Sequence, residues 1–452
     1  MTRCERAAGS VRSCGTSRYM RKVYRSPPRR NRIGCPGTLP APIAPIRSAP
    51  SLMELLAWIL FVPVVFVAVY WTIVWIRVER MVRDRPTVRA GLAIDVPEDG
   101  WPSVSIVIPA HNEERVIDAC CASLRKQIYP HYEVVFVLDR CTDRTREIVA
   151  RHAEEDDRIR FIEIDHCPDD WAGKCNAARH GAEVATGEWL LFTDADTEFD
   201  PDLVRAAVAI AREQNVSLFS LLSSLTYDQK HERIAQPVAG MTLVRMYPFQ
   251  RSRSKKPVRP FANGQFMLFD RAWYEKIGGH AAVKDDLLED LAFARLVQRQ
   301  GGRSLTYLAD QMLRCSMYDS MDALRAGWKR IFIEACRRNP ARLRQNAWRV
   351  IGGGVGVPVL QGFALLSVVA FALVGEFAWV GVLLITISAG LIAQAVTLSR
   401  IYRLSGVPLS AIVYYPLGCW IIGRAMLDGA HDLEARRPIR WGGREYVLEP
   451  RT

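Results

Sequence analysis

Apolar residues form two kinds of segment along this chain. Four long runs lie at residues 53–76, 350–374, 377–398 and 407–427. Crossing a hydrocarbon core of about 30 Å takes about 20 helical residues, so each run predicts a membrane helix. Between the first run and the other three, the apolar runs are short and alternate with polar segments. Such short runs predict the strands and helices of a soluble domain.

The charges that flank the apolar runs predict a membrane organisation. The basic stretch 77–85 follows the first run directly, and the positive-inside rule places such a flank in the cytoplasm. We therefore expect one transmembrane helix at 53–76, a cytoplasmic domain at 86–345 and a group of membrane helices at 350–427. The protein is then expected to be a multi-pass protein of the cell (plasma) membrane.

The number of C-terminal crossings stays open. Pro416 and Gly418 interrupt the last apolar run, which predicts either a kinked crossing or a segment that dips into the membrane and returns. The group at 350–427 therefore has two or three crossings, and the basic tail at 428–452 lies on one side or the other accordingly.

The basic excess of the chain lies in its first residues. The net charge is +12, and residues 1–52 alone carry eleven basic side chains and one acid. This Pro- and Arg-rich leader predicts disorder, and it conflicts with an external N-terminus. Met53 opens the first apolar run, which suggests that translation begins there; N-terminal sequencing that finds Met1 would exclude this.

Apolar runs and helical segments alternate regularly between residues 104 and 196. Four strands are expected, each breaking into a polar loop, and helices are expected between them. The strands are predicted near 104–108, 133–138, 159–165 and 188–192, and the helices near 116–127, 143–155 and 173–185. This alternation predicts an α/β domain with a mainly parallel sheet. Ligands of such sheets bind beyond the carboxyl ends of the strands, so the loops "PAHNEE", "DRCTD" and "TDAD" are expected along one edge.

Asp194 and Asp196 follow the fourth predicted strand, one residue apart. In isolation this spacing is typical of a polar turn. At the carboxyl edge of a parallel sheet it instead favours a divalent cation, because Mg²⁺ and Mn²⁺ take hard oxygen ligands and keep positions for phosphates. We therefore predict Mg²⁺ or Mn²⁺ as cofactor.

Five motifs in this order resemble the family 2 glycosyltransferases. They are "IVIPAHNEE", "LDRCTDRT", "GK" with the helix after it, "TDAD" and "LLED", and they span about residues 101–335. The resemblance implies a Rossmann-like GT-A fold and transfer of a sugar from a nucleotide-sugar donor, most often a UDP-sugar.

The resemblance also implies roles for individual residues. Asp196 and Asp194 would bind the metal and the diphosphate, and Asp290, beside Glu289, would be the catalytic base of an inverting transfer. The remaining positions implied for the nucleotide sugar are Pro109, Ala110, Glu113, Asp139 and Lys174. An acid in "LLED" is also typical of an ordinary helix N-terminus, and the metal motif upstream favours the base.

The sequence departs from the family pattern at two places. Leu138 and Arg140 flank Asp139 where the family usually has a second acid and a small residue, which leaves the nucleotide preference open. The Q-x-x-R-W motif of processive members is absent, although Trp328 in "RAGWKRIF" stands near its place.

Two basic stretches with apolar and aromatic residues predict contact with lipid headgroups. They lie at 241–260 and 328–350, next to apolar runs, and basic amphipathic segments favour the membrane interface; a solvated charged surface is the alternative. The flanking sequences also resemble membrane glycosyltransferases that act on carotenoid acids or are associated with hopanoids, which implies a polyprenoid lipid acceptor. Trp328 and His280 are then expected near the acceptor or behind it, and Trp441 and Arg444 would cover the site if the tail is cytoplasmic.

Other acceptors and one other function fit parts of the same pattern. A sphingolipid, a polyprenyl phosphate or a polysaccharide is an alternative acceptor, and an inactive membrane scaffold of the same fold is an alternative function. Outside the leader the charge is nearly balanced and no nucleic-acid-binding signature occurs, so nucleic acid is not expected as a partner.

Overall fold

A mixed sheet forms the centre of the α/β domain in the computed structural model, which describes residues 51–83, 86–95, 99–247, 260–286, 288–441 and 444–451. Its seven strands lie in the order β3-β2-β1-β4-β8-β6-β9. Only β8 runs against its two neighbours, so the predicted mainly parallel α/β fold is confirmed. The strands are β1 Val104–Ala110, β2 Tyr132–Asp139, β3 Ile159–Ile164, β4 Trp189–Phe192, β6 Leu218–Leu222, β8 Met267–Asp270 and β9 Ser304–Leu308.

Helices cover both faces of this sheet, because the strands are apolar on both sides. One face packs against η1 Val88–Ala93, α2 Ile117–Arg125, α3 Thr145–Glu155 and α5 Leu203–Glu213. The other packs against α4 Gly173–Val184, α7 Arg271–Lys276, η2 Gly279–Val283 and α8 Glu289–Arg299. A small second sheet, not anticipated from the sequence, joins β5 Thr197–Phe199, β10 Leu313–Cys315 and β7 Ser224–Leu225.

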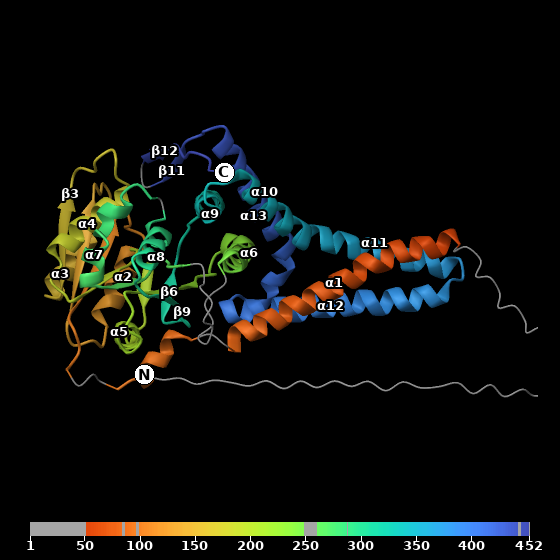
Figure 1. The fold of residues 1–452 in the computed structure, drawn as a ribbon, viewed down its shortest axis with the longest axis horizontal. Helices are drawn as coiled ribbons and strands as arrows, with labels where there is room; N and C mark the ends of the chain where they lie inside the picture. Colours follow the sequence, from red (N-terminus) through yellow and green to blue (C-terminus); the bar gives the residue numbers. More distant parts are fainter. Residues whose placement is uncertain are drawn as a thin grey trace, which may run out of the picture. The chain divides into compact units, whose positions relative to one another are not determined.

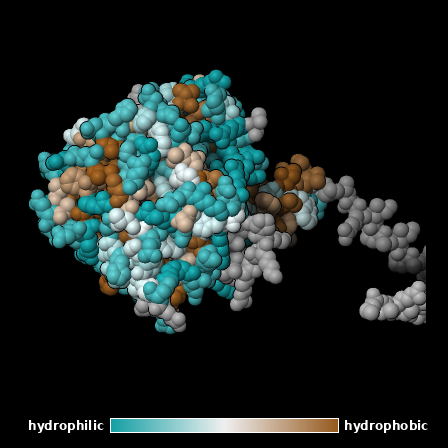
Figure 2. Space-filling model, turned by 60° about the vertical axis from the view of Figure 1, so that its left-hand side comes forward, coloured by the Kyte–Doolittle hydropathy of each residue, from teal (hydrophilic) through white to brown (hydrophobic). Residues whose placement is uncertain are grey.

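Three long helices pack side by side away from the sheet (Figure 1). They are α1 Leu52–Arg83, α11 Val357–Leu373 and α12 Phe377–Ser405. Trp58 and Trp379 meet edge to face at one end, and at the other end Arg400 Nε lies 2.8 Å from Glu79 Oε1. Large apolar side chains on these helices are exposed, whereas the visible face of the α/β domain is largely hydrophilic (Figure 2).

Four helical segments of the described chain are long and apolar enough to cross a membrane. They differ from the predicted runs mainly at their ends. The first continues to Arg83, and the second begins in α10 Pro340–Ile351 and continues through a π-helical turn, η3 Gly352–Gly356, into α11. The fourth divides into η4 Leu409–Tyr414 and α13 Tyr415–Glu434. Pro416 therefore lies in the first turn of α13, where proline is well tolerated, and does not interrupt a helix.

Helix α13 packs against protein along much of its length. It contacts α10 and two helices of the α/β domain, α6 Lys230–Met246 and α9 Met321–Ala335. A Cβ at Gly418 would lie 2.1 Å from the carbonyl oxygen of Ile234 in α6, so only glycine allows these helices to approach so closely. The fourth apolar run thus joins the α/β domain to the membrane helices.

The tail is partly structured. Residues assigned to a basic tail from 428 onward begin inside α13, which continues to Glu434, and then form a hairpin of β11 Ile439–Trp441 and β12 Arg444–Tyr446. The backbone N–H of Arg451 donates to Arg338 O, which fixes the tail beside α9. The leader at 1–50 and most of the basic stretch 241–260 lie outside the described residues.

Candidate active site

The carboxyl ends of three neighbouring parallel strands carry the predicted motifs. Ala110, the last residue of β1, pairs with Leu138 of β2, and Val107 of β1 pairs with Phe192, the last residue of β4. The loops that begin with His111, Arg140 and Thr193 therefore leave one edge of the sheet, as predicted. Because β8 is antiparallel, the turn that precedes it reaches the same edge.

Lys174 links the metal motif to the predicted base segment. Its Nζ lies 2.7 Å from Asp194 Oδ1 and 2.6 Å from Glu289 Oε1. The lysine belongs to the first turn of α4, Asp194 follows β4, and Glu289 begins α8. The two carboxylates raise the pKa of the lysine although burial acts against this. A loop and two helices, spaced over 116 positions, are thus joined by one half-buried cation.

Asp290 is held by backbone donors. Its Oδ2 accepts a hydrogen bond of 2.8 Å from Gly264 N, in the turn before β8, and its Oδ1 accepts one of 2.6 Å from Leu291 N. Burial and the neighbouring Glu289 carboxylate raise the pKa of Asp290 to about 7, while Lys174 and the two backbone bonds act in the opposite direction. A carboxyl group with this pKa can exchange a proton near neutral pH.

Three carboxyl groups face one another around the metal motif. Burial and the charges of Asp194 and Glu113 raise the pKa of Asp196 to about 8. Burial and the charge of Asp194 raise that of Glu113 to about 7. Carboxyl groups gathered without enough cations destabilise the folded state, so this cluster indicates a place where positive charge binds.

The residues at this edge fit a divalent cation. Among the described residues no cluster of three or more His, Cys, Asp or Glu side chains has the arrangement of a metal site. However, Asp196 Oδ1 is buried and accepts no hydrogen bond within the described chain. Mg²⁺ typically takes one or two protein carboxylates and completes its shell with water and substrate phosphates. Asp194 and Asp196 can supply these two carboxylates.

Asp139, the residue implied to hold the nucleotide base, is the last residue of β2, and its carboxylate forms an ion pair with the next residue, Arg140. Arg140 donates from Nε to Asp139 Oδ1 at 2.7 Å and from Nη2 to Oδ2 at 2.8 Å. Arg140 adopts a left-handed backbone conformation with φ of 49°, which turns its side chain back toward the carboxylate. A base that binds to Asp139 therefore meets a guanidinium group as well.

The other predicted residues are placed unevenly around the site. Pro109 and Ala110 form the end of β1 and not the loop after it. His280 is 2 % exposed, lies 2.7 Å from the Tyr274 hydroxyl and has its pKa lowered to about 3 by burial, so it is a packed neutral histidine. Trp328 is buried in α9 and stacks on Phe332. The side chains of Trp441 and Arg444 are not described.

Sequence patterns did not single out Gly264. A Cβ at this position would lie 2.9 Å from Lys174 Nζ and 3.3 Å from Glu289 Oε1. Glycine lets the turn "ANGQF" lie close to the ion pairs without displacing the end of the Lys174 side chain, and its N–H positions Asp290. The only available signal was the Asn-Gly pair, which is typical of turns but says nothing about the partner.

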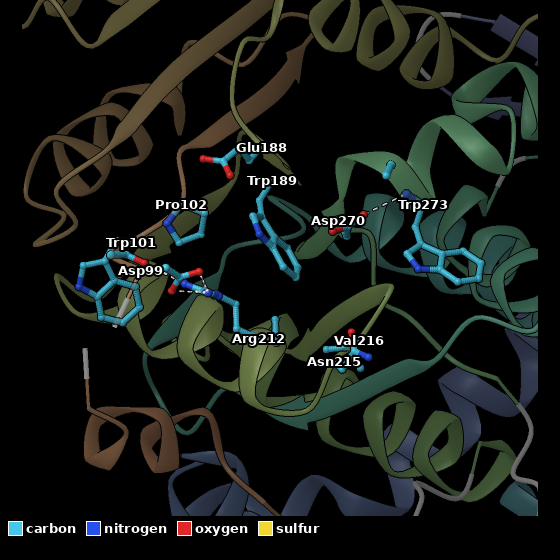
Figure 3. Close-up of a pocket in the computed structure, with 13 residues that line it drawn as sticks. Asp99, Trp101, Pro102, Glu188, Trp189, Arg212, Asn215, Val216, Asp270 and Trp273 are labelled. Carbon is cyan, nitrogen blue, oxygen red and sulfur yellow. Dashed lines mark hydrogen bonds and ion pairs between the residues drawn. The ribbon is translucent and has the colours of Figure 1, made fainter. Parts of the chain in front are cut away.

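A hollow of about 430 Å³ lies at the opposite edge of the sheet (Figure 3). Trp101, Trp189 and Asp270 line it, near the start of β1, at the start of β4 and at the end of the antiparallel β8. Its charged groups have partners in the protein: Arg212 binds Asp99, and Glu188 accepts from Ser103 N. The candidate site is therefore the acidic edge and not this hollow.

Comparisons with known proteins find the same family that the order of the motifs indicates. Residues 105–278 match the family described as glycosyl transferase family 2. The 4,4'-diaponeurosporenoate glycosyltransferase of Staphylococcus haemolyticus is 27% identical over 212 residues, which is 46% of this chain and 55% of that protein. The beta-monoglucosyldiacylglycerol synthase of Nostoc is 27% identical over 214 residues, 46% of this chain and 44% of that protein. The match thus spans about half the length of these relatives. The solved mannosyltransferase PcManGT from Pyrobaculum calidifontis, in complex with GDP-Man and Mn²⁺, aligns over 84% of this chain and 98% of its own, with 19% identity and a TM-score of 0.44.

Proposed function

Because residues 105–278 form a family 2 glycosyltransferase domain, we propose that the protein transfers a sugar from a nucleotide-sugar donor to a membrane lipid. The proposal is carried by the link that Lys174 makes between Asp194 and Glu289. This link places the acid pair after β4 and the candidate base Asp290 in one connected site. The relatives matched over this domain support the reaction class, and the arrangement of the residues in this chain supports the roles proposed for Asp194, Asp196 and Asp290.

The donor side of the site is formed by the metal motif. We propose that Asp194 and Asp196 hold Mg²⁺ or Mn²⁺, which would stabilise the charge of the departing nucleoside diphosphate. Lys174 neutralises Asp194 and can exchange this carboxylate for a phosphate oxygen. Asp139 and Arg140 lie at the end of β2, where the base of the nucleotide, in our proposal uracil, would bind.

The acceptor side is formed by Asp290. We propose that its ionised carboxylate takes the proton of the acceptor hydroxyl or carboxyl as that group attacks the anomeric carbon of the sugar. Attack opposite the leaving diphosphate inverts the configuration of that carbon. Gly264 and Leu291 hold the carboxylate in place through their N–H groups, and Glu289 is occupied by Lys174, so Asp290 is the better candidate of the two acids.

A lipid acceptor is supported by the way the α/β domain is joined to the apolar helices. Helices α6 and α9 pack directly against α13, and Cβ atoms at Gly418 and Gly429 would meet Ile234 and Ile333. The domain is thus attached to the apolar helices by packed contacts and not by a linker alone. Two relatives carry names of enzymes that act on an apolar acid or form a glycolipid. We propose a polyprenoid acceptor of carotenoid or hopanoid type; a diacylglycerol-type lipid is the second candidate, because of the glucosyldiacylglycerol synthase match.

The experiment that tests this function uses membranes containing the full chain. They are incubated with Mn²⁺ and, separately, with radiolabelled UDP-glucose, UDP-N-acetylglucosamine and GDP-mannose, and the lipids are then extracted into organic solvent. Label in the lipid fraction with at least one donor supports the proposal. Absence of lipid label with every donor, in membranes where the protein is folded, favours an inactive scaffold.

We further propose that the C-terminal tail lies on the same side of the membrane as the α/β domain. If α1, α11 and α12 cross while α13 stays at the interface against α6 and α9, the tail returns to the catalytic side. The bond from Arg451 N to Arg338 O in the segment after α9 supports this arrangement.

A reporter fused after Thr452 tests this topology. A fluorescent protein that matures only in the cytoplasm is expected to fluoresce there, and alkaline phosphatase at the same position is expected to be inactive. A matched fusion at Gly375, in the turn between α11 and α12, should give the opposite pair of results. Active phosphatase at the C-terminus would overturn the three-crossing arrangement.

A further inference from the structure

The chain that follows β10 runs beside the metal motif. β10 pairs antiparallel with β5, the strand directly after Asp196, and Ser316 N donates to Asp196 O at 3.1 Å. Gln265, in the turn before β8, donates from Nε2 to Cys315 Sγ at 2.8 Å. The residues from Cys315 onward are therefore part of the wall around Asp196, although no motif marks them.

Tyr318 is the notable side chain of this wall. Its ring lies against α9 at Gly327, where a Cβ would come within 2.3 Å of the ring. Its backbone carbonyl oxygen is 3.1 Å from His231 Nε2 in α6. The ring thus lies against α9 while the backbone of Tyr318 is held by α6, and the glycine in "AGW" is explained by the room that this ring requires.

The hydroxyl of Tyr318 is buried and makes no hydrogen bond within the described chain. Leaving a buried polar group unsatisfied is costly, and native structures rarely do so without a function or a bound group. Burial raises the pKa of this hydroxyl above its usual value, and the charges of Cys315, Asp196 and Asp194 add to this effect, while Arg330 acts in the opposite direction. At neutral pH the group is therefore a hydrogen-bond donor, two residues after Ser316, whose N–H bonds Asp196 O.

A ligand that accepts a hydrogen bond from the Tyr318 hydroxyl must bring oxygen atoms close to that hydroxyl. Asp194 already pairs with Lys174, and in the proposed function Asp194 and Asp196 bind a divalent cation. The group that such a cation holds beside them is the diphosphate of the nucleotide sugar. Hydrogen bonds to phosphate oxygens are short and stronger than those between neutral groups.

We propose that Tyr318 is a donor-binding residue whose hydroxyl donates a hydrogen bond to the phosphate next to the transferred sugar. This inference rests on the proposed function. Because negative charge increases on that phosphate as the glycosidic bond breaks, the hydrogen bond strengthens toward the transition state. Tyr318 then contributes more to turnover than to binding of the intact donor.

The substitution Tyr318→Phe tests the inference, because it removes only the oxygen and keeps the ring against Gly327. We expect kcat to fall about 10²-fold, the lower end for loss of one such donor, with a smaller change in KM for the nucleotide sugar. In the presence of Mn²⁺, affinity for the nucleoside diphosphate product should also fall, while affinity for the matching nucleoside monophosphate should not, since it lacks the second phosphate. These measurements use full-length protein in membranes or detergent.

Two further variants keep the result interpretable. Tyr402→Phe removes another buried hydroxyl without a partner in the described chain, in α12 away from the acid pair, and should leave kcat unchanged. Gly327→Ala displaces the ring of Tyr318 and should lower kcat, with no further loss when combined with Tyr318→Phe. If Tyr318→Phe keeps kcat within about twofold of an active wild type, or weakens monophosphate and diphosphate equally, the inference is wrong. Wild-type protein that is inactive with every donor would instead refute the proposed function.

Discussion

Asp290→Asn is expected to lower sugar transfer about 10³-fold while the nucleotide sugar still binds. A general base contributes about 10²- to 10⁴-fold to a rate, and an amide cannot accept the proton of the attacking acceptor. The amide oxygen can still accept from Gly264 N, which bonds Asp290 at 2.8 Å, so the turn before β8 should stay in place. Initial rates of lipid labelling, measured beside donor binding by calorimetry, separate the two effects.

Asp322→Asn is the matched control for Asp290→Asn. Asp322 also lies in the first turn of a helix, α9, but its side chain is 96% exposed. Both substitutions remove an acid that complements a helix dipole, so equal losses would show that Asp290 stabilises a helix and is not the base. We expect Asp322→Asn to retain full activity.

The pH dependence of the wild type gives an independent result for the same residue. Burial and Glu289 raise the pKa of Asp290 to about 7, and only the ionised form can act as base. The value of kcat/KM for the acceptor should therefore fall about tenfold for each pH unit below about 7. The residual activity of Asp290→Asn should lack this fall. A wild-type profile that is flat between pH 5 and pH 7 would contradict the assignment.

Asp196→Asn is expected to abolish metal-dependent donor binding and at the same time to stabilise the protein. Loss of a carboxylate ligand should weaken Mn²⁺-dependent binding by at least about 10²-fold. In the folded chain, burial, Asp194 and Glu113 raise the pKa of Asp196 to about 8, so the folded state loses stability progressively as the pH rises from the unfolded pKa near 4 to about 8, and the full cost persists above that pH. The amide removes that cost, and the unfolding temperature at pH 8 should rise.

The combination of lost binding and gained stability distinguishes a metal ligand from a structural acid. Calorimetric titration of the nucleotide sugar with and without Mn²⁺ measures the first effect, and thermal unfolding without metal at pH 8 measures the second. Asp200→Asn is a suitable control, since Asp200 follows β5 and lies outside the acid cluster. Undiminished binding by Asp196→Asn, or a lower unfolding temperature, would contradict the metal role.

The sheet could be predicted because its signal is local. Apolar runs at 104–108 and 133–138 give strands, and a helical segment between them requires a parallel connection. The antiparallel direction of β8 was not predictable, since an apolar run such as "MLFD" has the same pattern in both directions. The course of α13 also escaped prediction. Its composition fits a membrane crossing, whereas the structure shows it packed against α6, α9 and α10.

The candidate site residues that lie in sequence motifs could be predicted. The residues that reach the site only through long-range contacts could not. Residues 105–278 match the glycosyl transferase family 2, whereas the roles of Asp194, Asp196 and Asp290 remain predictions. The contact of Gly264 with Asp290 joins residues 26 positions apart, and the pairing of β10 with β5 brings the segment before Tyr318 beside Asp196. At neither position does the residue type or the spacing in the sequence predict which residue it contacts.

The most direct test of the account is a comparison of membrane lipids from a strain with and without the gene. We predict that the parent contains a glycosylated lipid that the deletion strain lacks, and that the deletion strain accumulates the matching unglycosylated lipid. Wild-type protein should restore the glycolipid, and Asp290→Asn at equal expression should not. Identical lipid profiles in parent and deletion strain, or restoration by Asp290→Asn, would contradict transfer of a sugar to a membrane lipid at this site.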